Sequence, residues 1–149
     1  MSRIMTRSFL QSIRQFVEGN SSVRKVAGDV SLTSELILLV RMMMADGELR
    51  AAELENFKRI CQAAFGIPQE DVPQVMQYLK DFGYSTTAAD AASMFAGFEP
   101  ERKQALLLHM LAIAKSDDQL DVSEADLIRR TAAILGLTAG DIAAVQSQI

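Results

Sequence analysis

One stretch of the sequence occurs twice. Its first copy, residues 36–72, reads LILLVRMMMADGELRAAELENFKRICQAAFGIPQEDV, and its second copy, residues 106–142, reads LLLHMLAIAKSDDQLDVSEADLIRRTAAILGLTAGDI. Asp46 pairs with Asp117 at a spacing of 71 residues, and after one gap Gly66 pairs with Gly136 at a spacing of 70. A match that continues over this length predicts an internal duplication.

Each copy predicts two helices that are joined by a short acidic turn. The first helix, residues 36–45 or 105–114, is apolar on nearly every side, which is typical of a buried central helix. The second helix has one apolar face, and Gly66 or Gly136 ends it, because glycine readily adopts the left-handed conformation common at helix ends. Pro68 or Thr138 then opens a further helix, and Asp141 completes a capping pattern with Thr138.

The sequence therefore predicts an all-α, single-domain protein of about seven or eight helices over residues 1–149. No window alternates like a strand, and 149 residues suit one core of ordinary size. The predicted parts are an N-terminal amphipathic helix at about residues 4–18, repeat unit one at about 36–80 and repeat unit two at about 105–149. A short helix between the units is predicted from a cap at Ser85 to about Phe95.

Composition excludes several classes of function. Fifteen basic residues against 19 acidic ones give a net charge of −4, which argues against a nucleic-acid partner. The lone cysteine, Cys61, allows no internal disulfide and no zinc cluster, and this pattern favours a cytoplasmic protein. No apolar run approaches the roughly 20 residues of a membrane span. The N-terminal segment either docks on the domain or lies on a membrane surface, and a transit peptide is the remaining alternative.

The two acidic turns share the frame D-x-x-L-x-x-x-E, reading ADGELRAAE at residues 45–53 and SDDQLDVSE at 116–124. This doubled frame after an apolar helix resembles the TerB-like family, over about residues 32–145. That family comprises the tellurite-resistance protein TerB and its relatives, including the N-terminal domain of the DjlA co-chaperones. The resemblance implies a duplicated helical domain, a role in tellurite resistance or a related stress response, and a divalent-metal site. The acids at the matching positions are Asp46, Glu53, Asp117 and Glu124.

Carboxylates without thiolates or imidazoles suit hard cations such as calcium, magnesium or manganese. Additional ligands are available from Glu48, Asp118 and Asp121. The turns are too short for an EF-hand loop, and Asp118 stands where the first turn has Gly47, so the two backbones need not match.

A purely structural role for the same acids is the alternative. Glu53 and Glu124 would then interact with the helix macrodipole, each contributing about 0.3–1 kcal/mol, and Asp46 would shape its turn with Gly47. The sequence leaves both interpretations open.

Two side chains invite a catalytic interpretation. His109 aligns with Leu38, an apolar position, which predicts a core histidine whose hydrogen bonds are satisfied. Cys61 lies on an apolar helix face and is predicted to be a small buried hydrophobe, with a redox role as the alternative.

The sequence holds no phosphate loop, nucleophile elbow or zinc-protease motif, and it therefore favours a non-enzymatic module with protein partners. A protein-interaction or dimerisation module of the DjlA accessory-domain type is the first alternative. A hydrolytic enzyme that uses a metal held by the acids is the second.

Overall fold

The computed structural model describes residues 20–45, 47, 49–82, 86–115 and 122–148. Within these ranges the chain forms eight α-helices, one short 3₁₀ helix at Gln69–Asp71 and no strand, so the prediction of an all-α domain is confirmed. The predicted helix at residues 4–18 lies outside the described residues. The α-helices are α2 (Ser21–Ala27), α3 (Val30–Met43), α4 (Ala51–Phe65), α5 (Val72–Phe82), α6 (Ala88–Ser93), α7 (Pro100–Ala114), α8 (Val122–Leu135) and α9 (Ala139–Gln146).

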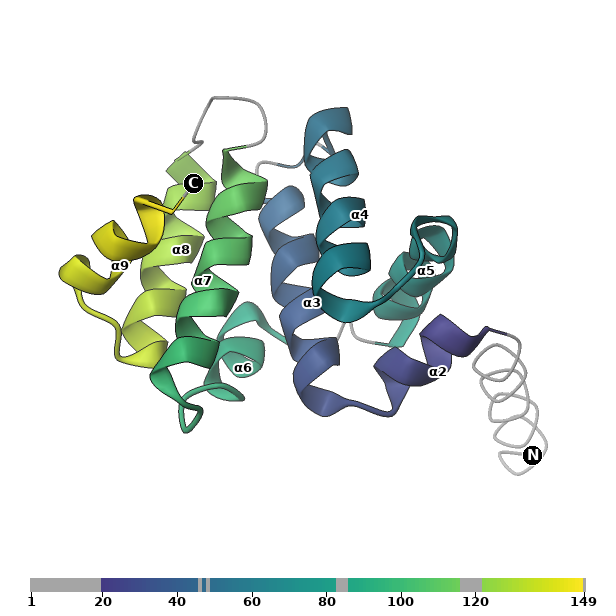
Figure 1. Ribbon diagram of the computed structural model, residues 1–149, viewed down its shortest axis with the longest axis horizontal. Coiled ribbons are helices and arrows are strands. Elements are labelled where there is room, and N and C mark those ends of the chain that lie inside the picture. Colours follow the sequence, from purple (N-terminus) through teal and green to yellow (C-terminus); the bar gives the residue numbers. More distant parts are fainter. Residues whose placement is uncertain (1–19, 46, 48, 83–85, 116–121, 149) are drawn as a thin grey trace, which may run out of the picture.

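Helices α3 and α7 form the centre of the molecule, as their apolar sequences predict. They pack on each other, and α3 also contacts α2, α4, α5 and α6, whereas α7 also contacts α4, α8 and α9 (Figure 1). Their buried side chains make up much of the core. The largest of these that are fully buried are Leu36, Leu38, Leu39, Met42, Met43, Leu106, Leu107, Met110 and Leu111.

In both helical hairpins, α3–α4 and α7–α8, the end at which the first helix stops and the second begins lies at the same end of the bundle (Figure 1). Helix α3 ends and α4 begins at the upper end of Figure 1, and α7 ends and α8 begins at that end too. The end of α3, the start of α4, the end of α7 and the start of α8, which flank the two acidic turns, therefore lie on one face (Figure 1). We call this face the turn end.

The predicted helix stops are confirmed at both matched positions. Gly66 has φ +66° and Gly136 has φ +73°, the left-handed region that other residues rarely adopt. In each case the next residue closes the helix, because the N–H of Ile67 donates to the carbonyl of Cys61 and the N–H of Leu137 to that of Ala132.

The predicted cap of the last helix is also confirmed. Thr138 and Asp141 form a reciprocal capping box at the start of α9. Hydrogen bonds from the Thr138 backbone N–H and hydroxyl lower the pKa of Asp141. This lowering stabilises the fold above the ordinary carboxyl pKa, and the contribution is lost as the pH falls through the lowered value.

Three predicted boundaries were wrong in detail. Helix α3 begins at Val30 rather than at residue 36, because the side chain of Asp29 caps it by accepting from the N–H of Leu32. Helix α7 begins with Pro100 as its first residue rather than at residue 105. The side chain of Thr87 caps α6, and Ser85 lies outside the described residues. The first turns of α3 and α7 contain polar residues, so a search for continuous apolar sequence places the start of each helix too late.

No helix in the described part of the chain is long and apolar enough to cross a membrane.

Candidate functional site

The structure describes two of the seven acids that the sequence selected as metal ligands. Glu53 lies in the first turn of α4, and Glu124 lies in the first turn of α8. The others, Asp46, Glu48, Asp117, Asp118 and Asp121, lie outside the described residues.

Both described glutamates are buried, each with only 2% of its surface exposed. They occupy matched positions of the two copies, and both belong to the turn end of the bundle (Figure 1). Placing a carboxylate out of water is unfavourable unless charge or hydrogen bonds compensate it. Glutamates that serve only as surface charges are normally exposed, so the burial of two of them at equivalent positions calls for a further role.

A direct contact ties the start of α4 to the end of α7. One helical turn after Glu53, the side-chain amide of Asn56 donates to the carbonyl of Ala112 at 2.8 Å. Ala112 lies in the last turn of α7, directly before the second acidic turn. The start of α4 is therefore fastened to the end of α7, which brings the ends of both hairpins together.

Among the residues that the structure describes, no three histidine, cysteine or acidic side chains form a group that could hold a metal ion. A complete ligand set needs the aspartates of the turns, which lie outside those residues. The donors that are described, two buried carboxylates, fit a hard cation by their chemistry.

A second site, which the sequence analysis missed, lies between α3 and α7. Glu35 is fully buried, and its carboxylate accepts from Nη2 of Arg102 at 2.5 Å and from Nδ1 of His109 at 2.6 Å. Because a carboxylate only accepts hydrogen bonds, Nδ1 of His109 carries the proton. The ring of Phe65 meets the His109 imidazole edge to face at 5.7 Å. We call Glu35, Arg102 and His109 the buried ionic cluster.

The prediction that His109 is a satisfied histidine is confirmed, although its side chain keeps 19% exposure. The sequence did contain a signal for its partners. Arg102 and His109 are seven residues apart and hence share a face of α7, and Glu35 directly precedes the apolar run of α3. Pairing them requires knowing that α3 packs on α7.

Cys61 is fully buried on α4, as predicted. Burial, with a smaller contribution from the negative charge of Glu35, raises the pKa of its thiol from 9.0 to about 12. A thiol that stays protonated is a poor nucleophile and a poor metal ligand. This environment argues against the redox alternative.

We expect native Cys61 to react with iodoacetamide at pH 8 about 1,000-fold more slowly than in unfolded protein, because three pKa units reduce the thiolate fraction by that factor. Labelling followed by mass spectrometry, with and without urea, measures both rates. Equal rates in the two states would show that the thiol is accessible and ionises normally.

Comparison with known proteins agrees with this architecture. The family model described as "Tellurite resistance protein TerB" matches residues 33–147. No curated protein matches the sequence. A solved structure, a protein of unknown function from Porphyromonas gingivalis W83, is 28% identical, with a TM-score of 0.58. The match covers 80% of this chain and 92% of that one.

Proposed function

Because this chain belongs to the TerB family of tellurite-resistance proteins, we propose that it is a non-enzymatic cytoplasmic module of tellurite resistance or a related stress response. We propose further that it binds a divalent cation, calcium, magnesium or manganese, between its two acidic turns. The observation that carries this proposal is the burial of Glu53 and Glu124 at matched positions on the turn end.

The contacts around the glutamates support a shared site. The Asn56–Ala112 hydrogen bond holds the start of α4 against the end of α7, which favours a site shared by both turns. Asp46 and Asp117 would add one carboxylate from each turn, and Glu48, Asp118 and Asp121 are further oxygen donors. Carboxylate oxygens of this kind are the ligands that calcium, magnesium and manganese prefer.

A non-enzymatic role is supported by the state of the lone cysteine. Burial raises the pKa of the Cys61 thiol to about 12, so the thiol stays protonated and is a poor nucleophile. His109 donates a hydrogen bond from Nδ1 to Glu35, but Cys61 does not supply the activated nucleophile that covalent catalysis would pair with a histidine base.

Isothermal titration with calcium, magnesium and manganese tests the proposal. We expect at least one of the three to bind at millimolar or lower concentration, and we expect the variant Asp46→Asn with Asp117→Asn to lose that binding. The matched control is Glu55→Gln with Asp126→Asn, which removes the same charge from exposed positions of α4 and α8. No heat of binding with any of the three ions, or equal loss in the control, would refute the site.

Interaction with a protein partner, or self-association of the DjlA accessory-domain type, is a second candidate function. It is favoured by three exposed apolar side chains beside the turns, because large exposed apolar groups often mark contact surfaces. They are Met44 (45% exposed), Leu49 (45%) and Val122 (79%). Sedimentation velocity of the wild type and of Val122→Ser tests self-association, and a monomer at all concentrations would contradict it.

A further inference from the structure

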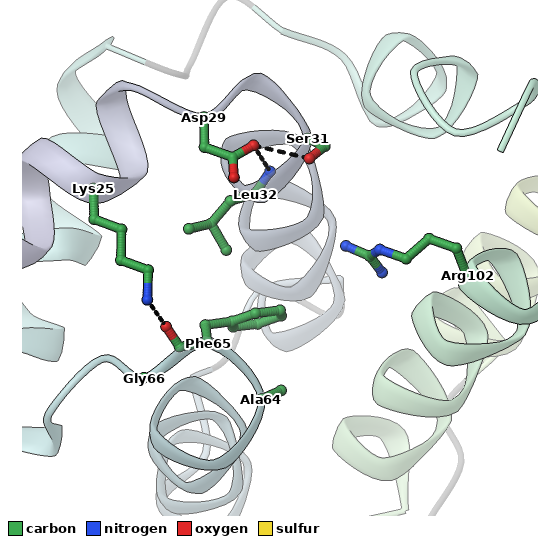
Figure 2. Close-up of a pocket in the computed structure, with 8 residues that line it drawn as sticks. All are labelled: Lys25, Asp29, Ser31, Leu32, Ala64, Phe65, Gly66 and Arg102. Carbon is green, nitrogen blue, oxygen red and sulfur yellow. Dashed lines mark hydrogen bonds between the residues drawn. The ribbon is translucent and has the colours of Figure 1, made fainter. Parts of the chain in front are cut away.

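A pocket of about 290 Å³ opens on the side of the bundle away from the acidic turns. It lies where the end of α2, the start of α3, the end of α4 and the start of α7 converge (Figure 2). Figure 2 shows Lys25 reaching the backbone carbonyl of Phe65 from one side, while Arg102 extends from α7 on the opposite side. Neither the family match nor the acidic turns assign a role to this pocket.

The two cations of the pocket are only partly engaged. Nζ of Lys25 donates to the backbone carbonyl of Phe65, and among the described residues no carboxylate lies within ion-pair distance of it. Arg102 uses Nη2 for Glu35, its guanidinium lies over the Phe95 ring at 5.2 Å, and its side chain keeps 34% exposure. Lys25 can accept a further anionic partner.

The one acid in the pocket wall is already occupied by local contacts. Oδ1 of Asp29 accepts from the N–H of Leu32 and from the hydroxyl of Ser31, and these bonds lower the pKa of Asp29. The start of α3 is thereby capped by its own side chain and offers no anion site. Asp29 remains charged, and it therefore disfavours ligands that carry two negative charges.

The rest of the wall is apolar or lacks a side chain. Leu32, Ala64 and the ring of Phe65 line the floor between the two cations. Gly66 leaves room for the ammonium group, since a Cβ there would lie 3.2 Å from Nζ of Lys25. A ligand that fills this space needs an apolar body as well as a charge.

We propose that the pocket binds a small organic monocarboxylate, with its carboxylate held by Lys25 and its apolar body lying on Phe65 and Leu32. The Glu35 carboxylate offsets Arg102 and Asp29 is held by its local contacts, so Lys25 is the cation with which a single negative charge would pair. A small ligand in a pocket of this size makes few contacts, and a dissociation constant of about 1–10 mM is expected.

Benzoate is the probe that tests the proposal, in a titration followed by nuclear magnetic resonance. We expect benzoate to shift the amide signals of Ser31 and Gly66 with saturation, and we expect the uncharged benzamide and inorganic sulfate to shift them far less. Lys25→Gln should weaken benzoate binding about fivefold, which corresponds to one exposed ion pair. The matched control is Lys58→Gln, which removes an exposed lysine of α4 and should leave binding unchanged.

Each remaining outcome would overturn the proposal. Equal shifts with benzamide would mean that the pocket recognises an apolar body without a charge. Equal shifts with sulfate would mean that it attracts any anion. Benzoate shifts that map to the turn end, or that both lysine variants alter alike, would place the binding elsewhere.

Discussion

Replacement of Glu35 by alanine is expected to lower the free energy of unfolding by about 2–3 kcal/mol. The change removes the carboxylate that accepts from both Arg102 Nη2 and His109 Nδ1 at the α3–α7 contact. This expected cost is at or below the lower end of the range for breaking a buried ion pair, about 3–5 kcal/mol. It is reduced because Arg102 and His109 are partly exposed and can both reach water.

Urea denaturation followed by circular dichroism measures this effect. Glu55→Ala is the matched control, since Glu55 is exposed on α4 and its pair with Lys58 spans one helical turn, and its loss should cost less than about 0.5 kcal/mol. A Glu35→Ala protein as stable as the wild type would show that the buried ionic cluster contributes nothing to holding α3 on α7.

Replacement of Phe57 by alanine is expected to cost more, about 4 kcal/mol, a large fraction of the roughly 5–15 kcal/mol that stabilises a typical domain. Phe57 is fully buried on α4 and is among the largest side chains of the core, so that its removal leaves a cavity. Ile128, its counterpart on α8, is 4% exposed, and Ile128→Ala should cost about 3 kcal/mol.

The same denaturation experiment measures both variants. Met94→Ala is the control, because Met94 is an apolar side chain that keeps 43% exposure and its truncation should cost less than about 1 kcal/mol. Costs for Phe57→Ala and Ile128→Ala that do not exceed the cost of this control would contradict the description of one core shared by α4 and α8.

Those features of the fold that leave a local signal in the sequence could be predicted from it. Apolar runs marked α3 and α7 as central, and Gly66 and Gly136 marked the ends of α4 and α8, because burial and the left-handed conformation each leave a residue-level signature. The structure reports matching burial and helix ends at the paired positions, whereas the duplication itself stays a prediction.

The buried ionic cluster could not be predicted in the same way. Glu35 precedes Arg102 by 67 residues and His109 by 74 residues in the chain. Each of the three by itself resembles a solvated or isolated polar residue. Only the contact between α3 and α7 makes them partners. For the candidate metal site the sequence supplied the ligand types, and the structure adds the burial of Glu53 and Glu124 and the hydrogen bond that brings the two hairpins together.

The most direct measurement of the central claim is thermal unfolding with and without calcium, magnesium or manganese at about 5 mM, in the wild type and in Glu53→Gln with Glu124→Gln. A ligand that binds only the folded state raises its stability, by about 2.7 kcal/mol when present at 100 times its dissociation constant. We predict a rise in Tm for the wild type with at least one of the three ions and none for the double variant, while Glu55→Gln with Asp126→Asn keeps the rise. An unchanged wild-type Tm with every ion would contradict the claim, as would a rise that the double variant retains.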